Sequence, residues 1–229
     1  MVPNPAETVQ PAAVLFSAGL DSAVLLAHAL KRGPAQPVYV SMGLAWEPEE
    51  RAAAARLLGH AAYAGALPLA SLSLEMRDVY RESHWAVRGE APAFDTPDED
   101  VYLDGRNIVL LAKAAVFMAR SGLTRVLLGP LAGNPFPDAS AEFFTAMARA
   151  LSIGLAVPIA IETPFGSMHK GDVIRLGAAA GVPLELTLSC MQPAGGLHCG
   201  RCSKCRERRD GFAEAGLEDR TTYAVAPIR

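Results

Sequence analysis

Residues 12–22, AAVLFSAGLDS, decide the fold, because an apolar run passes directly into a turn of small residues and then into a helix. The run at 12–17 has the length and apolar character of a buried strand. Residues 20–31 then space their apolar side chains as a helix does. A strand that leads through a tight turn into a helix predicts the first unit of an α/β fold.

The turn itself, Ser17-Ala18-Gly19-Leu20-Asp21-Ser22, has the features of a phosphate site. Its small residues let the backbone approach a ligand, and free N–H groups at a helix start favour an anion. Ser17 and Ser22 add hydroxyl donors. Asp21 would repel a triphosphate unless Mg²⁺ lay between them, so its presence indicates a complex of a metal ion with a nucleotide. The same residues also fit an ordinary turn in which Asp21 or Ser22 caps the helix.

Short apolar runs and stretches of helical period alternate along the rest of the chain. Expected strands cover residues 12–17, 37–41, 67–74, 124–129 and 157–163, and expected helices cover 20–31, 51–64, 105–122 and 140–152. This alternation predicts an α/β fold, a doubly wound and mainly parallel five-stranded sheet with helices on both faces. In such sheets ligands bind beyond the carboxyl ends of the strands, at a topological switch point.

Length and composition favour one globular domain over residues 1–229, with 51% hydrophobic and 20% charged residues. A net charge of -3 argues against a nucleic-acid partner, and no uninterrupted apolar run is long enough to cross a membrane. Residues 1–11 lack the features of a secretory signal and are expected to form a flexible lead-in. Residues 84–104 are acidic and without period, which predicts a lid or a disordered loop.

All four cysteines fall near the C-terminus, with the spacing C-x8-C-x2-C-x2-C: Cys190, Cys199, Cys202 and Cys205. Clustering of this kind indicates a metal site in a reducing cytoplasm rather than disulfides. Four thiolates predict a closed, structural Zn²⁺ site within a C-terminal extension over 187–223. An iron–sulfur cluster and a redox C-x-x-C remain as alternatives. The alternating charges at 206–210 predict a solvated helix.

The phosphate turn resembles the S-G-G-x-D-S loop of the ATP pyrophosphatase (PP-loop) superfamily, whose fold is adenine nucleotide alpha hydrolase-like. Ala18 stands where that pattern has glycine, which is tolerable if its φ is negative. Together with the cysteine tail, the loop resembles the 7-cyano-7-deazaguanine synthase family of queuosine biosynthesis. The likeness extends along nearly the whole chain, through Gly105-Arg106-Asn107, Pro137-Asp138, Glu162-Thr163-Pro164, Lys170 and the tail residues Ser189-Cys190, His198-Cys199-Gly200, Cys202 and Cys205.

The resemblance implies an enzyme that adenylates 7-carboxy-7-deazaguanine with ATP, aminates it with ammonia, activates the amide again and dehydrates it to the nitrile. It implies catalytic roles for Asp21, Lys170 and Arg106, and a homodimer. Nucleotide contacts are expected from the loop residues Ser17, Ala18, Gly19, Leu20, Asp21 and Ser22, and from Val40, Ser41, Gly105, Asn107 and Gly129. Substrate contacts are expected from Arg106, Asp138, Glu162 and Thr163.

Structural roles are open for three of these residues. Arg106 could pair with Asp104, Lys170 could cap a helix surface, and Asp138 could cap the helix that follows it.

The chain departs from the family pattern at 42–47 and 131–139, where apolar residues replace polar ones that could contact a deazaguanine. Two alternatives therefore stand beside the synthase. One is a related ligase that conjugates another carboxylate to an amine or a protein, and the other is an inactive, zinc-stabilised nucleotide-binding protein.

Overall fold

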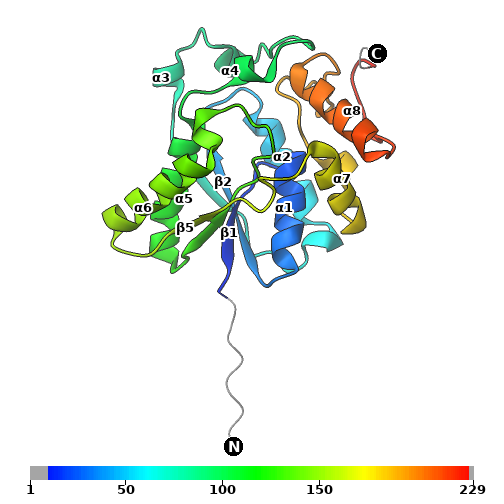
Figure 1. The fold of residues 1–229 in the computed structure, drawn as a ribbon. Coiled ribbons are helices and arrows are strands. Elements are labelled where there is room, and N and C mark those ends of the chain that lie inside the picture. The colour runs from blue at the N-terminus through cyan, green and yellow to red at the C-terminus, as the bar shows by residue number, and fades with distance from the viewer. Residues whose placement is uncertain (1–9, 227–229) are drawn as a thin grey trace, which may run out of the picture.

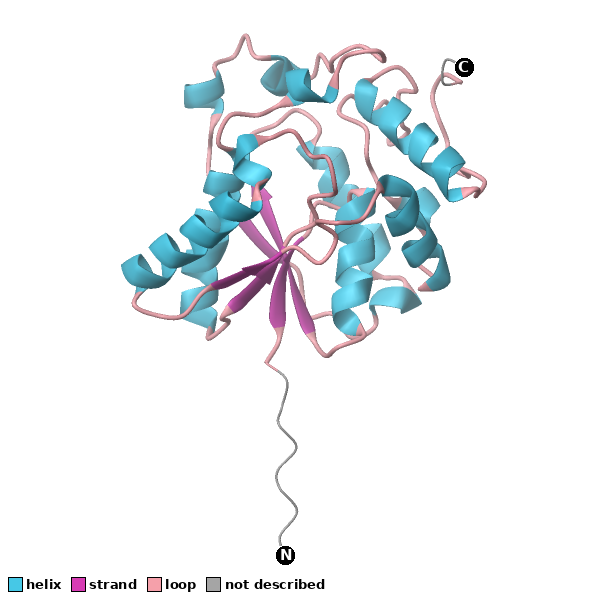
Figure 2. Cartoon of the chain, in the orientation of Figure 1, coloured by secondary structure: helices cyan, strands magenta, loops and turns pink. Residues whose placement is uncertain are grey.

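A five-stranded parallel sheet forms the centre of the protein, in a computed structural model that describes residues 10–226 (Figures 1 and 2). Its strand order is β3-β2-β1-β4-β5. The strands are β1 (Ala12–Leu15), β2 (Ala35–Ser41), β3 (Ala70–Ser73), β4 (Arg125–Leu127) and β5 (Ala160–Glu162). The order runs outward from β1 in both directions, which places the topological switch point between β1 and β4. The predicted doubly wound α/β fold is confirmed.

Helices cover both faces of this sheet (Figure 1). One face carries α1 (Leu20–Leu30), α2 (Glu47–Leu58) and α7 (Lys170–Ala179), and the other carries α5 (Arg106–Ser121) and α6 (Ala141–Leu155). Alternate side chains of the first strand divide between the two cores. Val14 packs in the α1 core, whereas the neighbouring Ala13 packs in the α5 core.

The central helix α5 shows how the sequence sets this packing. Leu111, Ala114, Ala115 and Met118 are fully buried and recur at the three- and four-residue spacing of one helix face. The helix ends at Gly122, whose φ of 71° is the left-handed conformation that glycine adopts without strain. Helix α5 therefore lies flat on the sheet with its first turn directed at the carboxyl ends of the strands.

The structure corrects two parts of the predicted element pattern. Helix α2 begins at Glu47 and ends at Leu58, not at 51 and 64, because Pro48 and three acidic residues favour its first turn and Gly59 follows its last residue. Helix α7 was not expected, since interior glycines lower helix propensity. A Cβ at Gly177 would lie 2.6 Å from Val24, so this glycine allows α7 to pack closely against α1.

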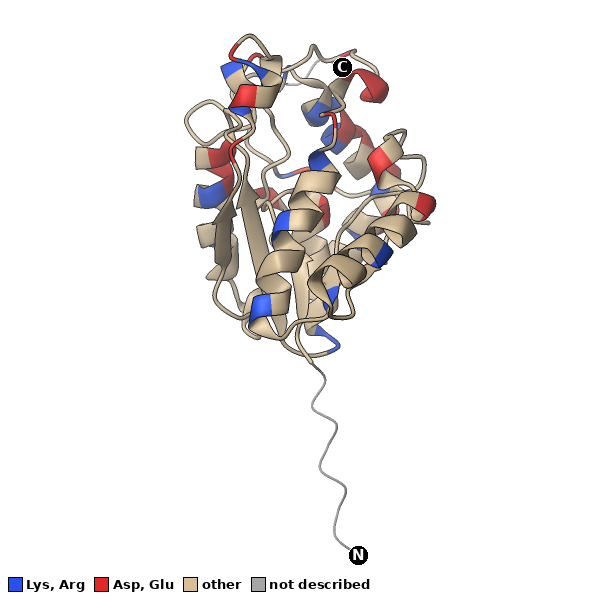
Figure 3. Cartoon of the chain, turned by 90° about the vertical axis from the view of Figure 1, so that its left-hand side faces the viewer, with Lys and Arg blue, Asp and Glu red and all other residues tan. Residues whose placement is uncertain are grey.

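Smaller elements complete the described chain. They are η1 (Ala61–Tyr63), α3 (Arg77–Tyr80), α4 (Trp85–Arg88), η2 (Asp98–Val101), η3 (Pro137–Ala139), η4 (Leu184–Leu186) and α8 (Ser203–Ala215). Residues 1–9 of the expected lead-in lie outside the described residues. None of the described helices combines the length and apolar character needed to cross a membrane. Acidic and basic residues are interspersed on the face shown in Figure 3.

The segment 84–104 contains α4 and η2 and is fastened to α8. Arg206 of α8 donates to the backbone oxygens of Phe94 at 2.8 Å and Thr96 at 3.0 Å. Its guanidinium also pairs with Asp98 at 3.2 Å. The backbone N–H of Ser203 donates to the oxygen of Pro92. Through these contacts the segment covers the carboxyl ends of the strands (Figure 1). The position of the segment therefore depends on the C-terminal extension.

Ala18 has a φ of 61°, so the condition of a negative φ, under which an alanine would be tolerated here, is not met. This is the left-handed region, where a Cβ costs about 1–2 kcal/mol. The residue is fully buried, and its backbone oxygen accepts a hydrogen bond from the N–H of Leu188. The turn therefore has a left-handed backbone conformation, which glycine adopts without strain, at a position that alanine occupies.

We expect Ala18→Gly to change the free energy of unfolding by less than about 1 kcal/mol, because relief of the left-handed strain offsets the lost methyl burial and the added chain entropy. The matched control is Ala27→Gly, at a buried position in the middle of α1. There every contribution is unfavourable, and the loss should be about 2 kcal/mol. Urea unfolding measures both. Equal losses in the two variants would show that Ala18 is not strained.

Candidate active site

A cavity of about 290 Å³ opens at the carboxyl ends of β1, β2 and β4. The phosphate turn, the strand ends and the first turn of α5 line it together. Among the expected site residues, it includes Ser17, Gly19, Asp21, Ser22, Val40, Arg106, Asn107, Gly129 and Asp138. Residues separated by more than a hundred positions thus meet at the predicted switch point.

The phosphate turn presents backbone donors to this cavity. Gly19 occupies the N-cap position of α1 and makes no side-chain capping bond. Ser22 donates its hydroxyl to the oxygen of Gly19 at 3.0 Å, so neither Ser22 nor Asp21 caps the helix. A Cβ at Gly19 would lie 3.3 Å from the Ser17 hydroxyl, inside the small space of the turn. An uncapped helix start beside two hydroxyls suits a phosphate group.

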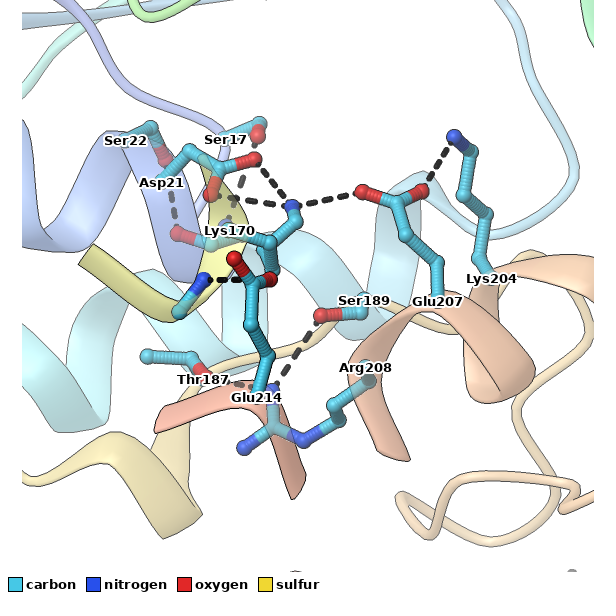
Figure 4. A network of polar contacts seen from close by, with 12 residues as sticks. Ser17, Asp21, Ser22, Lys170, Thr187, Ser189, Lys204, Glu207, Arg208 and Glu214 are labelled. Atoms are coloured by element: carbon cyan, nitrogen blue, oxygen red, sulfur yellow. Dashed lines mark hydrogen bonds and ion pairs between the residues drawn. The ribbon is translucent and has the colours of Figure 1, made fainter. Parts of the chain in front are cut away.

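Lys170, the first residue of α7, joins the phosphate turn to the C-terminal helix (Figure 4). Its Nζ lies 2.7 Å from Asp21 Oδ2 and 2.6 Å from Glu207 Oε1. Lys204 reaches the other oxygen of Glu207, also at 2.6 Å. Asp21 and Lys170, both expected among the site residues, therefore lie together as an ion pair, and Lys170 does not cap an exposed helix surface.

The charges in this group reinforce one another. Burial alone would lower the pKa of Lys170, but the carboxylates of Asp21 and Glu207 outweigh it and hold that pKa above its usual value. Burial likewise would raise the pKa of Glu207, and the two lysines hold it below its usual range instead. The ammonium of Lys170 and the carboxylate of Glu207 are thus charged at neutral pH.

Asp138 lies at the start of α5 instead of capping the helix after it. Its Oδ2 accepts the backbone N–H of Asn107 at 2.8 Å, and its backbone oxygen accepts the Asn107 side chain at 2.9 Å. Ser140, not Asp138, caps α6. Burial raises the pKa of Asp138. This carboxylate fixes the first turn of α5 and, with it, the position of Arg106.

Arg106 points a buried and unpaired group into the site. Its Nε is inaccessible to solvent and has no hydrogen-bond partner in the described part of the chain. None of the ion pairs found there joins Arg106 to Asp104. A buried donor without a partner is rare, so this guanidinium is suited to an anionic ligand.

Other expected site residues lie outside the first cavity. Glu162 binds Arg125 through two hydrogen bonds of 2.6 and 2.9 Å along neighbouring strands, and Thr163 follows it. Gly105 is the left-handed N-cap of α5, and Ser41 donates its hydroxyl to Glu47. Ala18 is buried beneath the turn. The structure therefore brings most of the predicted nucleotide residues together but leaves Glu162 and Thr163 outside.

A second cavity of about 230 Å³ adjoins the first and extends toward α8. Ser17, Gly19, Asp21, Glu50 and Arg106 line both. Leu20, Trp46, Trp85, Lys170, Lys204 and Glu207 line the second alone. The rings of Trp46 and Trp85 stack at 5.8 Å, which joins the 84–104 segment to α2. Both tryptophans are part of the wall of this cavity.

Two buried carboxylates were missed from the sequence. Glu47 and Glu50, in the first turn of α2, are 4% and 8% exposed and line the first cavity. Glu47 accepts the N–H of Met42 at 2.6 Å. Glu50 accepts the hydroxyl of Tyr39 at 2.9 Å. The available signal was the run Glu47-Pro48-Glu49-Glu50, whose proline marks a helix start directly after a strand.

The four cysteines form one cluster. Their sulfur atoms all lie within 4.8 Å of one another, and the shorter pairs are 3.5–3.9 Å apart. Zn²⁺ at about 2.3 Å from four tetrahedral sulfurs would hold those sulfurs about 3.8 Å apart. Backbone N–H groups of Gln192 and Cys199 point at the sulfur of Cys190, as they do in thiolate sites. The residues thus fit a four-coordinate zinc ion.

Arg208, expected on a solvated helix, is instead buried at 1% exposure, because its turn of α8 packs inward. The guanidinium donates to Thr221 at 2.7 Å, Thr187 at 2.8 Å and the oxygen of Leu184 at 2.6 Å.

Burial lowers the pKa of His198 to about 3. The neutral ring accepts the N–H of Ser189 at 3.0 Å. His198 thus lies next to the cysteine cluster and is held by Ser189.

The chain is similar to known proteins along nearly its whole length. Residues 11–216 match the family model of the queuosine biosynthesis protein QueC. A 7-cyano-7-deazaguanine synthase of Anaeromyxobacter dehalogenans is 34% identical over 225 residues, which cover 93% of this chain and 95% of that protein. One from Thiobacillus denitrificans is 35% identical over 226 residues, covering 93% and 98%. A predicted tRNA methyltransferase subunit of Methanocaldococcus jannaschii aligns with a TM-score of 0.49 at 14% identity, over 96% of this chain and 99% of that one.

We expect Cys202→Ser to remove most of the bound zinc and to destabilise the C-terminal extension, because zinc binding in small modules supplies about 10–16 kcal/mol. The control is Ser203→Ala, at the next position, whose hydroxyl has no hydrogen-bond partner among the described residues. Metal content by mass spectrometry and protease sensitivity at 84–104 and 187–223 measure the effect. An unchanged zinc content in Cys202→Ser would contradict the four-thiolate site.

Proposed function

The chain belongs to the queuosine biosynthesis protein QueC family, and we propose that it converts 7-carboxy-7-deazaguanine and ammonia to 7-cyano-7-deazaguanine. The reaction consumes ATP and releases AMP and pyrophosphate. The carboxylate is first activated as its adenylate and aminated to the amide. The amide is then activated with a second ATP and loses its oxygen to give the nitrile.

One observation carries the proposal, namely the phosphate turn with Lys170 beside it. The N–H groups at the start of α1 and the hydroxyls of Ser17 and Ser22 would hold the pyrophosphate half of ATP. Lys170, 2.7 Å from Asp21, would move its charge toward the phosphates as they bind. This intact set of groups favours an active enzyme over the zinc-stabilised binding protein.

The two cavities suggest how the substrates divide. Val40 and Gly129, at the ends of β2 and β4, would contact the nucleotide in the first cavity. The stacked Trp46 and Trp85 offer the second cavity an apolar wall for a planar heterocycle. Arg106 lines both cavities, so its unpaired guanidinium would contact the carboxylate or the α-phosphate between them.

Mg²⁺ and Zn²⁺ have separate roles in this proposal. Asp21 would hold the Mg²⁺ that accompanies ATP and neutralises phosphate charge. The four cysteines would hold a structural Zn²⁺ that keeps α8, and therefore Glu207, next to Lys170. The family resemblance alone supports action in the cytoplasm as a homodimer.

The direct test incubates the purified protein with Mg-ATP, ammonium and 7-carboxy-7-deazaguanine, and follows products by mass spectrometry. We expect AMP and the nitrile, with the amide as an intermediate. A reaction without added carboxylate is the control for background ATP hydrolysis. If a folded, zinc-loaded protein forms neither AMP nor nitrile, the assignment of this substrate fails.

We expect Lys170→Ala to lower kcat/KM for AMP formation on the order of 10²-fold or more, because a preorganised charge at a phosphate group contributes on that scale. The control is Lys31→Ala, at the exposed C-cap of α1. Zinc content should remain unchanged in both variants. A Lys170→Ala enzyme with the activity of the Lys31→Ala control would show that the ion pair to Asp21 is structural only.

A further inference from the structure

Glu50 lies where the two cavities meet. It is 8% exposed, belongs to the first turn of α2 and lines both cavities, as Arg106 does from the opposite helix α5. The wall between a nucleotide cavity and a substrate cavity is where an acyl group would be transferred. A carboxylate at this place faces a region that anionic phosphates are expected to occupy. Because like charges repel, the position of this carboxylate suggests a chemical role.

The side chain is held firmly but is not neutralised. The Tyr39 hydroxyl donates to Glu50 Oε2 at 2.9 Å, and the Trp46 side chain donates as well. None of the ion pairs in the described part of the chain includes Glu50. A buried carboxylate without a paired cation is costly and favours binding of a cation or a donor.

Burial also places its protonation near neutrality. It raises the pKa of Glu50 to about 7, against the opposing charge of Arg106 and with a further rise from Glu47. Charged and titratable groups face Glu50 from four other elements: Tyr39 of β2, Arg106 of α5, and, across the second cavity, Asp21 of α1 and Lys170 of α7. A base whose pKa lies near the working pH transfers protons most effectively.

Ammonia needs such a base. At neutral pH it is almost entirely ammonium, as other amines are. Ammonium has no lone pair and cannot attack an acyl carbon. It is also a small cation with four N–H donors, which an unpaired carboxylate binds well in a site shielded from water.

We propose that Glu50 binds the ammonium ion and takes a proton from it, releasing ammonia against the acyl adenylate. This inference rests on the proposed function. One N–H bond of ammonium breaks, its electron pair stays on nitrogen, and the proton passes to the Glu50 carboxylate. The nitrogen then bonds to the acyl carbon, the bond from that carbon to the AMP oxygen breaks, and AMP leaves with the electron pair. The new amide nitrogen loses its extra proton to water, and Glu50 later returns its proton to solvent.

The test separates activation of the carboxylate from amination. Carboxylate-dependent exchange of labelled pyrophosphate into ATP, without ammonium, reports adenylation alone. We expect Glu50→Gln to retain this exchange within about threefold and to lose amination by ammonium on the order of 10²-fold at pH 7. Glu49→Gln, on the same helix turn but outside both cavities, is the matched control and should resemble the wild type.

Hydroxylamine gives a second comparison, since it is largely uncharged at neutral pH and needs no base to become a nucleophile. We expect Glu50→Gln to form the hydroxamate at nearly the wild-type rate. The loss with ammonium should shrink at higher pH, where free ammonia becomes available. In the wild type, kcat/KM calculated per ammonium ion should fall as the pH drops through about 7, because Glu50 gains its proton there. The hydroxylamine reaction should lack this fall.

Each contrary result has a distinct meaning. Loss of pyrophosphate exchange with a raised KM for the carboxylate would show that Glu50 contacts the heterocycle, and would overturn the proposal. Equal losses with ammonium and hydroxylamine would do the same. The wild-type pH profiles decide the matter even if Glu50→Gln does not fold. A wild type that shows neither exchange nor product would overturn the proposed function, and this proposal with it.

Discussion

The ammonium group of Lys170 is the contact on which the arrangement of the site depends. It lies between Asp21, at the start of the chain's first helix, and Glu207, in its last described helix. Without Lys170, Asp21 would lose this ion pair and Glu207 would keep only its contact with Lys204, so two carboxylates would face each other with less opposite charge between them. The lysine therefore connects the phosphate turn, the α7 helix and the cysteine-bearing extension into one structure.

The four-cysteine cluster acts on the same centre from a distance. The cysteines fix the start of α8, and two residues of that helix then reach in different directions. Glu207 binds Lys170 at the start of α7, while Arg206 donates to the backbone oxygens of Phe94 and Thr96 in the covering segment. The cysteine cluster can thus set both the position of Glu207 beside Lys170 and the position of the covering segment.

Much of this was predictable from the sequence, and the limits have physical causes. The phosphate turn and the cysteine cluster are contiguous, so their spacing indicates their chemistry directly. The sheet followed from alternating periods, but α7 did not, because Gly171 and Gly177 are weak helix formers that serve close packing. Arg208 and Glu50 were not foreseen either. Both are charged residues that become buried only when a distant segment packs over them, and local pattern carries no information on such contacts.

The place of α8 along the chain has a consequence for protein synthesis. On the ribosome β1 and the phosphate turn emerge first, then the other four strands, and Glu207 follows only after all of them. Until that helix has been translated, Lys170 has a single carboxylate partner, and the covering segment 84–104 lacks its attachment to Arg206. All five strands therefore leave the ribosome before the residues that complete the contacts of Lys170 and of the covering segment.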